Sequence, residues 1–301
     1  MVNKVTRENL FYAFKPDIPA VLHVAPGEEV LLETHDCFQG QIRTPEDLVT
    51  TLDWSHTNPA TGPVFVEGAH PGDILRLDVL DVEVENQSFM VAIPGEGALG
   101  DVITDMETAV LRREGGELVF KERVRIPLTI MIGVIGVAPE SETIPNGVPG
   151  FHGGNLDCTL VRKGSKIYLT VQKEGGLFGA GDLHAAMGDG EIVVCGAEAP
   201  GLVRLRPELI SLPGLPTPFI ETDDLVATIH SDPDLQKSVD GAIHRMSEFL
   251  IQVVGLSQND AGMLMSAVGS LKFCQVVDPA KTTRFEFPKS VLKQLGFSMP
   301  A

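Results

Sequence analysis

One stretch of the chain, residues 151–198, combines acidic and histidine side chains with many glycines. The side chains concerned are His152, Asp157, Asp182, His184, Asp189, Glu191 and Glu198. Carboxylate oxygens and imidazole nitrogens are ligands for divalent metal ions. Glycine lets the backbone turn sharply and approach a bound group closely. We therefore interpret the stretch as a metal-assisted active site.

Each motif in this stretch also has a plainer structural interpretation. The sequence GGNLDC, residues 153–158, is typical of an Asn/Asp turn with local side-chain capping. Asp182 and His184 lie two residues apart, so in an extended segment both project to the same side and could hold one ion. Histidine is, however, also common as a core residue. The motifs alone therefore do not decide whether these side chains are metal ligands or parts of ordinary turns. For Asp189, in GDGE, the solvated turn is preferred.

An upstream strand adds a candidate from a distant part of the sequence. Residues 30–36 alternate so that Asp36 shares a face with Val30 and Leu32, whereas Glu33 lies on the other face. Charged residues at strand ends usually face solvent. Because Asp36 has apolar neighbours on its face, we expect it to point inward at something positive.

Composition limits the class of protein. The 301 residues are 43% hydrophobic, enough for one large domain or two to three small ones, and 31 glycines with 21 prolines predict many turns and short strands. The 41 acidic and 23 basic residues give a net charge of -18, which argues against nucleic acid and membrane surfaces as partners. No signal peptide, transmembrane run or CxxC pair is visible, so we expect a reduced, cytoplasmic protein.

Strand patterns predominate up to about residue 200. Residues 74–85 alternate in one phase as far as Val79 and in another from Leu80 onward. A one-residue change of phase inside a strand predicts a β-bulge. Residues 126–137 are almost wholly apolar, which predicts a strand buried on both faces.

Helical patterns come later in the chain. The sequence SDP at 231–233 provides a cap and a first-turn proline, and apolar residues then recur at helical spacing up to Gly255. Ser257 opens a second helix with a variant of the capping box. We therefore predict a mainly β, α+β protein, with a β-rich body (residues 1–200) that carries the site and a smaller α/β portion (residues 201–301) packed on it.

Six segments between about residue 20 and residue 280 resemble the acetamidase/formamidase family, in the same order. They are Glu33–Asp36, Asn58–Asp73, Ile132–Glu140, His152–Asp157, Gly175–Ile192 and Val276–Pro279. The resemblance implies hydrolysis of short carboxamides, such as formamide or acetamide, to a carboxylate and ammonia. It also implies sandwich- or barrel-like β lobes, a bound divalent metal, and a homodimer or higher oligomer. Met187 stands where the family usually carries glutamine, which predicts a more apolar substrate or an altered activity.

These observations together predict metal-assisted hydrolysis of a small-molecule amide. The candidate metal ligands are Asp36, His152, Asp157, Asp182 and His184. Zinc is the first choice because two histidines are available, and calcium stays an alternative as a structural ion. Glu33 or Glu191 would carry a proton to the leaving ammonia, and Asn155 would bind the carbonyl oxygen or the developing oxyanion.

Two other functions remain open at this stage. One uses a cysteine nucleophile, either Cys37 beside Asp36 or Cys158 beside Asp157. Adjacent residues on a strand face opposite ways, which argues against direct pairing of these side chains. The other is a non-enzymatic β-sandwich binding protein with a structural metal ion.

Overall fold

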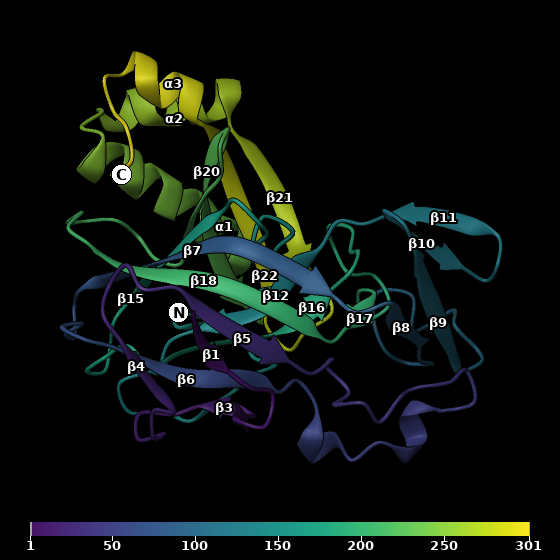
Figure 1. Ribbon diagram of the computed structural model, residues 1–301. Coiled ribbons are helices and arrows are strands. Elements are labelled where there is room, and N and C mark those ends of the chain that lie inside the picture. Colours follow the sequence, from purple (N-terminus) through teal and green to yellow (C-terminus); the bar gives the residue numbers. More distant parts are fainter. Residues whose placement is uncertain (1, 301) are drawn as a thin grey trace.

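Strands are the main regular elements of the structure, and most of them are hydrogen-bonded into two large sheets (Figure 1). The computed structural model describes residues 2–300. The nine-stranded sheet has the strand order β1 (Asn3–Val5), β5 (Val30–Thr34), β18 (Gly201–Ile210), β7 (Ile74–Val84), β15 (Lys166–Thr170), β19 (Phe219–Glu221), β20 (Leu225–Asp232), β22 (Lys281–Pro288) and β21 (Ser270–Gln275).

The second large sheet has eleven strands and is branched. Its main path is β11 (Val124–Pro127), β10 (Glu117–Phe120), β9 (Glu107–Glu114), β8 (Gln87–Ala92), β17 (Glu198–Ala199), β16 (Phe178–His184), β12 (Met131–Gly136) and β14 (Gly153–Asn155). The branch pairs β16 with β6 (Ala60–Val66), which also pairs with β2 (Leu10–Phe11) and β4 (Leu22–Val24). A separate small sheet consists of β3 (Ala13–Phe14) and β13 (Ile144–Pro145).

Side chains from both large sheets form one hydrophobic core. Leu32, Leu77 and Val203 reach it from the nine-stranded sheet, and Ile132 and Phe178 reach it from the other. Each of these side chains is fully buried, and such burial contributes about 1.5 to 3 kcal/mol per side chain. The mainly β prediction is confirmed. Both sheets are open, and no closed barrel forms within residues 2–300.

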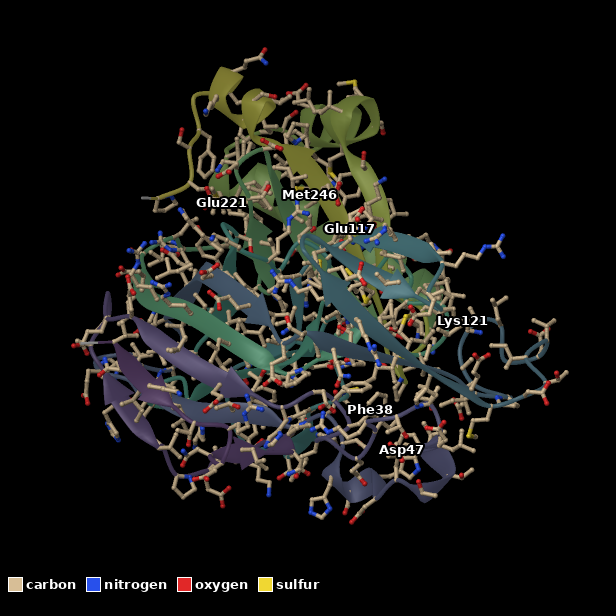
Figure 2. All side chains as sticks on the ribbon, turned by 45° about the vertical axis from the view of Figure 1, so that its right-hand side comes forward. Phe38, Asp47, Glu117, Lys121, Glu221 and Met246 are labelled. Atoms are coloured by element: carbon tan, nitrogen blue, oxygen red, sulfur yellow. The ribbon has the colours of Figure 1, made fainter. Side chains whose placement is uncertain are left out.

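Helices cover the C-terminal end of the nine-stranded sheet, at the top of Figure 1. They are α1 (Leu235–Glu248), the π-helical turn η3 (Phe249–Val253), α2 (Gln258–Val268) and α3 (Lys289–Gln294), while two short 3-10 turns, η1 (Val49–Thr51) and η2 (Trp54–His56), lie elsewhere. Tyr168, Phe219, Met246 and Phe287 form a second core under these helices. Figure 2 marks this layer by Met246 and shows Phe38 lower in the molecule.

The helix starts were predicted with mixed success. Ser257 caps α2, because its side chain accepts a hydrogen bond from the Asp260 N–H, so that prediction is confirmed. The predicted start at 231–233 is wrong. Ser231 pairs with β22 inside β20, and Asp234 caps α1 by accepting from the N–H groups of Gln236 and Lys237.

Strands β7 and β18 form the longest ladder, and it contains the predicted bulge. Asp81 pairs with Arg204 and Val79 pairs with Leu205, so Leu80 is the extra residue. β18 begins just after residue 200 and pairs with both β5 and β7. Strands from both sides of residue 200 therefore share one sheet, and the division into two portions stays a prediction.

Strand β12 lies between β14 and β16. All six residues of β12 are buried, as predicted for this apolar segment. The buried strand is shorter than predicted, because Ile126 belongs to the more exposed β11. Within residues 2–300, no helix has the length and apolar character needed to cross a bilayer.

Candidate active site

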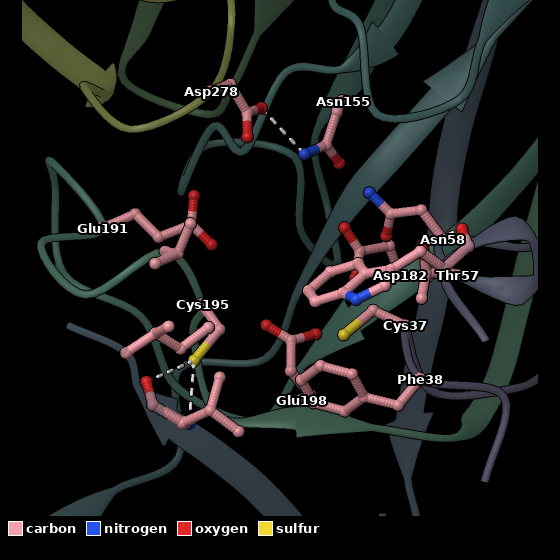
Figure 3. A pocket seen from close by; sticks show the side chains of 14 residues that line it. Cys37, Phe38, Thr57, Asn58, Asn155, Asp182, Glu191, Cys195, Glu198 and Asp278 are labelled. Atoms are coloured by element: carbon pink, nitrogen blue, oxygen red, sulfur yellow. Dashed lines mark hydrogen bonds between the residues drawn. The ribbon is translucent and has the colours of Figure 1, made fainter. Parts of the chain in front are cut away.

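A small cavity of about 130 Å³ lies where the loops after β5 and β16 meet the segment after β21. One wall is polar and mostly acidic. It consists of Asn155, Asp182, Glu191, Glu198 and Asp278. The other wall is mainly apolar and consists of Cys37, Phe38, Trp54, Thr57, Asn58, Val91, Ile93, Val194 and Cys195. In Figure 3 the carboxylates of Glu191, Glu198 and Asp278 face the space between the walls.

His184 is surrounded by carboxylates beneath this cavity. Its Nε2 atom lies 3.2 Å from an oxygen of Glu198, 3.5 Å from one of Asp182 and 3.8 Å from one of Asp157. All four side chains are at most 4% exposed. Four atoms bound to one tetrahedral ion at about 2.0 to 2.1 Å would be about 3.3 Å apart. The spacing of the group therefore suits a shared cation.

The polar atoms of this group lack hydrogen-bond partners. Within residues 2–300 these buried atoms are Asn155 Oδ1, both carboxylate oxygens of Asp157, Asp182 Oδ1, His184 Nε2, Glu191 Oε2 and Glu198 Oε2. A buried polar atom without a partner costs about 1 to 3 kcal/mol, and more when it is charged. So many unpaired acceptors at one place fit a bound cation.

Two triads have ligand atoms close enough to share an ion. They are Asp157, His184 and Glu191, and Cys37, Asp182 and Glu198; in each triad one ligand atom from each residue lies within 4.8 Å of the other two. Since His184 also lies beside Asp182 and Glu198, the triads adjoin. Carboxylate and imidazole donors suit divalent metals.

The backbone around the triads adopts a conformation that side chains rarely take. Asp157, Asp182 and Glu191 have φ values of 42°, 54° and 48°. Residues other than glycine cost about 1 to 3 kcal/mol in such regions, and they cluster at functional sites. These left-handed conformations, one of them inside β16, direct the three carboxylates differently from a regular strand.

Gly133 in β12 leaves room for two of the carboxylates. A Cβ atom at this position would lie 2.5 Å from Asp157 Oδ1 and 2.7 Å from Asp182 Oδ2. Both distances are shorter than real Cβ contacts. The sequence of β12 therefore keeps a glycine where a methyl group would displace the carboxylates.

The site holds protons tightly when no cation is present. Burial raises the pKa of Glu198 to about 7 and that of Asp278 to about 7. Burial, with the nearby acids, also raises the pKa of Asp157 well above its usual range. Burial alone would lower the pKa of His184, but the negative charges of Glu198 and Asp182 raise it well above 6.5. A cation would take over the role of these protons.

Asn155 and Asp278 form a polar pair at the cavity wall (Figure 3). The Asn155 side chain donates a hydrogen bond of 2.9 Å from Nδ2 to Asp278 Oδ2. The second Nδ2 hydrogen and the free Oδ1 atom remain for a ligand. A pKa of about 7 lets Asp278 take up or release a proton near neutral pH.

Comparison with known proteins identifies the family of this chain. The model of the acetamidase/formamidase family matches residues 3–148 and 141–293. The chain belongs to the acetamidase/formamidase family. The structure of an acetamidase from Bacillus halodurans is 41% identical, with a TM-score of 0.96 over 98% of this chain and 100% of that one. That of a predicted acetamidase/formamidase from Thermoanaerobacter tengcongensis is 39% identical, with a TM-score of 0.96 and 99% of each chain covered.

A curated formamidase from Methylophilus methylotrophus is 28% identical over 254 residues. That match covers 65% of this chain and 62% of the relative. This member of the acetamidase/formamidase family thus matches somewhat less than two thirds of the curated relative's length.

Five of the eight residues proposed from the sequence lie together at the site. They are Asn155, Asp157, Asp182, His184 and Glu191. The strongest signal in the sequence was the concentration of acidic and histidine side chains among glycines in residues 151–198.

Glu33 and Asp36 lie in other surroundings. The Glu33 carboxylate forms ion pairs with Lys4 and Arg7 at distances of 3.5 and 3.4 Å, and Glu33 does not line the cavity. Asp36 points inward as expected, but its oxygens accept hydrogen bonds from the N–H groups of Phe38 and Gly40 and from Arg43. Asp36 thus shapes the turn that presents Phe38 to the cavity and belongs to neither triad.

His152 is also outside both triads. It is fully buried, and its ring packs edge-on against Phe14 and Phe151, with centroids 5.3 and 5.6 Å away. Burial lowers the pKa of His152 to about 4, so the ring is neutral. The structure therefore brings one of the two proposed histidines to the acidic group.

Three cavity residues were missed as site candidates. Glu198 lies in the glycine-rich stretch and Asp278 in the VVDP segment, but neither has a spacing that singles it out. Asn58, in the mainly apolar wall, is distant in sequence from both of these acids. Only the fold brings these side chains to the cavity.

The cysteines and Met187 have defined places. Cys37 lines the cavity, but burial and the charges of Glu198 and Asp182 raise the pKa of its thiol well above 9. A protonated thiol is a poor nucleophile. Cys158 is fully buried and does not line the cavity. The Met187 sulfur lies 3.2 Å from His184 Nδ1, so Met187 contacts the ring from the side opposite the carboxylates.

Proposed function

We propose that this protein hydrolyses short carboxamides to a carboxylate and ammonia, with a divalent ion held by the acidic group. The observation that carries the proposal is a buried set of unpaired carboxylate and imidazole atoms at a small cavity whose remaining lining is mainly apolar. The relatives named acetamidase and formamidase support the substrate class.

The two walls suit the two ends of an amide. The carboxamide group would face Asn155, Asp278 and the carboxylates, and the acyl group would face Phe38 and Val91. Pockets for drug-sized ligands occupy about 300 to 1,000 Å³. The smaller cavity of about 130 Å³ supports a short acyl group.

Asp157, Asp182, His184 and Glu198 would hold the ion, with Glu191 beside them. When bound, such an ion supplies Lewis-acid polarisation of the carbonyl and lowers the pKa of water. We propose zinc because an imidazole nitrogen is in the set, and calcium stays the alternative because the other donors are oxygens.

Hydrolysis adds a water oxygen to the carbonyl carbon and breaks the C–N bond, so one proton must move from water to the leaving nitrogen. We propose that Glu191 holds that proton, since its carboxylate lines the cavity. Asp278 is the second candidate because of its pKa of about 7. Asn155 would fix the amide by donating from Nδ2 and accepting at Oδ1.

The test joins metal content to turnover. Purified protein is subjected to elemental analysis and then assayed for ammonia release from formamide, acetamide and propionamide, before and after chelation. We expect stoichiometric metal, loss of activity on chelation, and recovery with one divalent ion. Full activity in a verified metal-free preparation would refute the role of the ion. Absence of ammonia release from every amide, with metal present, would instead favour the binding protein.

Two properties of the whole protein also remain proposals. The resemblance to the acetamidase/formamidase family leads us to propose a homodimer or higher oligomer, which light scattering can test. The free cysteines Cys37, Cys158, Cys195 and Cys274 fit a reducing compartment, so we propose a cytoplasmic location, which fractionation can test.

A further inference from the structure

The single tryptophan of the chain stands at the mouth of the cavity. Trp54 lies in the short turn η2 and lines the cavity, yet it is 60% exposed. Its neighbours in the apolar wall, Phe38 and Val91, are only 5% and 4% exposed. The indole is therefore the outer end of a wall whose inner part is closed to solvent.

The backbone that carries Trp54 is held firmly. The Asp53 side chain accepts a hydrogen bond from the Ser55 N–H, and the Gln41 side chain accepts one from the Asp53 N–H and donates to the carbonyl oxygen of His56. The His56 ring packs edge-on against Tyr12. A turn fixed in this way holds the backbone of Trp54 beside the cavity.

We propose that Trp54 sets the upper limit on the length of the acyl group. The inference rests on the proposed amide hydrolysis and adds the substrate range to it. An acyl group that runs from the acidic wall along Phe38 and Val91 reaches the indole next. A short acyl group fits in front of this barrier, whereas a longer chain must displace the indole.

Contact with the indole also affects how strongly an acyl chain is bound. A tryptophan side chain offers about 150 to 250 Å² of surface for contact, so a chain that ends against it gains burial. One methylene more or less in an apolar pocket changes rates by about 10- to 200-fold. Replacing the indole with a methyl group removes the barrier and opens the inner apolar wall to longer chains.

The experiment compares amides of increasing length on the metal-loaded protein. We measure kcat/KM for acetamide, butyramide and hexanamide in the parent, in Trp54→Ala and in the conservative Trp54→Phe. We expect the hexanamide-to-acetamide ratio to rise at least about tenfold in Trp54→Ala and much less in Trp54→Phe. An unchanged ratio in Trp54→Ala would overturn the inference.

Met263→Ala is the matched control, because Met263 is 63% exposed on α2 and does not line the cavity. Its ratio should equal that of the parent. A rise in Met263→Ala as large as that in Trp54→Ala would also overturn the inference, since it would follow from the loss of any exposed apolar side chain.

A second measurement separates this inference from the proposed activity. Because Trp54 is the chain's only indole, its fluorescence reports directly on the cavity mouth. Titration with butyramide should change the emission in a saturable way, even if no ammonia is released. Ammonia release without any emission change would leave the activity standing and overturn the position of the acyl group against Trp54.

Discussion

At the scale of the residue, the absence of a side chain at Gly133 is as important for the acidic group as the ligands themselves. A Cβ atom on Gly133 would come within 2.5 Å of Asp157 Oδ1. We therefore expect Gly133→Ala to bind metal about 10- to 100-fold more weakly, the loss typical of disturbed groups around metal ligands. Isothermal titration of the metal-free protein with zinc measures this change.

Gly262→Ala is the control for Gly133→Ala. Nothing lies within 4 Å of a Cβ atom at Gly262, which is inside α2. Alanine is favoured over glycine in a helix by up to about 1 kcal/mol, so metal affinity should be unchanged and stability slightly higher. Equal metal affinity in both variants would contradict the role assigned to Gly133.

The cysteines give the second prediction at this scale. Because the Cys37 thiol is kept protonated by its surroundings, we expect Cys37→Ser and Cys158→Ser to keep turnover within about tenfold of the parent. The assay is ammonia release at equal metal content. Complete loss of turnover in Cys37→Ser, with metal still bound, would support a nucleophilic cysteine.

Residue types could be predicted better than residue surroundings. Asp36 points inward, as its alternation indicated, but the positive partners there are Arg43 and two backbone N–H groups. No sequence pattern shows whether an inward-facing aspartate caps a turn in this way or binds a metal ion. Asp278 had no local signal, because its place at the cavity depends on the path of β21 and β22.

At the scale of the element, the loop after β16 depends on a distant strand. Asp189 lies two residues before Glu191 and forms a paired contact with Arg284 of β22, at 2.7 and 2.9 Å. The Gly190 N–H donates to the Cys274 carbonyl oxygen at 2.9 Å. These contacts fix the left-handed turn at Glu191 against the end of the nine-stranded sheet.

We therefore expect Asp189→Asn to lower kcat about tenfold, since misplacement of a catalytic group by a fraction of an ångström is costly. Loss of the charged partner should also cost about 1.5 to 3 kcal/mol of stability. Kinetics and urea unfolding measure the two effects.

Glu286→Gln provides the matched comparison, because Glu286 also accepts a hydrogen bond from Arg284, at 2.7 Å, but is in β22 rather than in the loop. It should affect stability while leaving kcat close to that of the parent. A similar fall of kcat in both variants would mean that Arg284 acts through general stability.

Elements whose signals lie in neighbouring residues could be predicted from the sequence. Elements whose bounds depend on pairing with a distant strand could not. The phase change at Leu80 and the cap at Ser257 depend on neighbours in sequence, and both predictions are confirmed. The start of α1 depends on pairing between β20 and β22, which overrides the cap and proline signals at 231–233. The pairing partner, β22, is about fifty residues away in the sequence, so residues near 231–233 do not reveal it.

At the scale of the whole molecule, the buried acids make stability depend on pH and on the ion. The pKa of Glu198 is about 7 in the folded protein, compared with 4.5 as the unperturbed value. The folded state keeps this proton where the unfolded chain releases it, so the metal-free protein loses stability as pH rises from 4.5 to about 7. At about 1.4 kcal/mol per pKa unit, the loss amounts to a few kcal/mol.

A bound ion should reverse this trend, because its ligands must be deprotonated and its stabilisation therefore grows with pH. Urea unfolding of metal-free and metal-loaded protein at pH 5 and pH 7.5 provides the comparison. We expect similar stabilities at pH 5 and a large difference at pH 7.5. The same pH dependence with and without metal would rule out the acidic group as the binding place.

The segments that surround the cavity are spread along the chain from Cys37 to Asp278. Synthesis adds about 5 to 20 residues per second, so the growing chain spends many seconds with only some of the ligand residues made. Until the segment around Asp278 leaves the ribosome, the carboxylates made earlier, such as Asp182 and Glu198, lie in an incomplete cavity. We therefore expect each molecule to bind its metal ion late in synthesis and folding, after most of its sheets have formed.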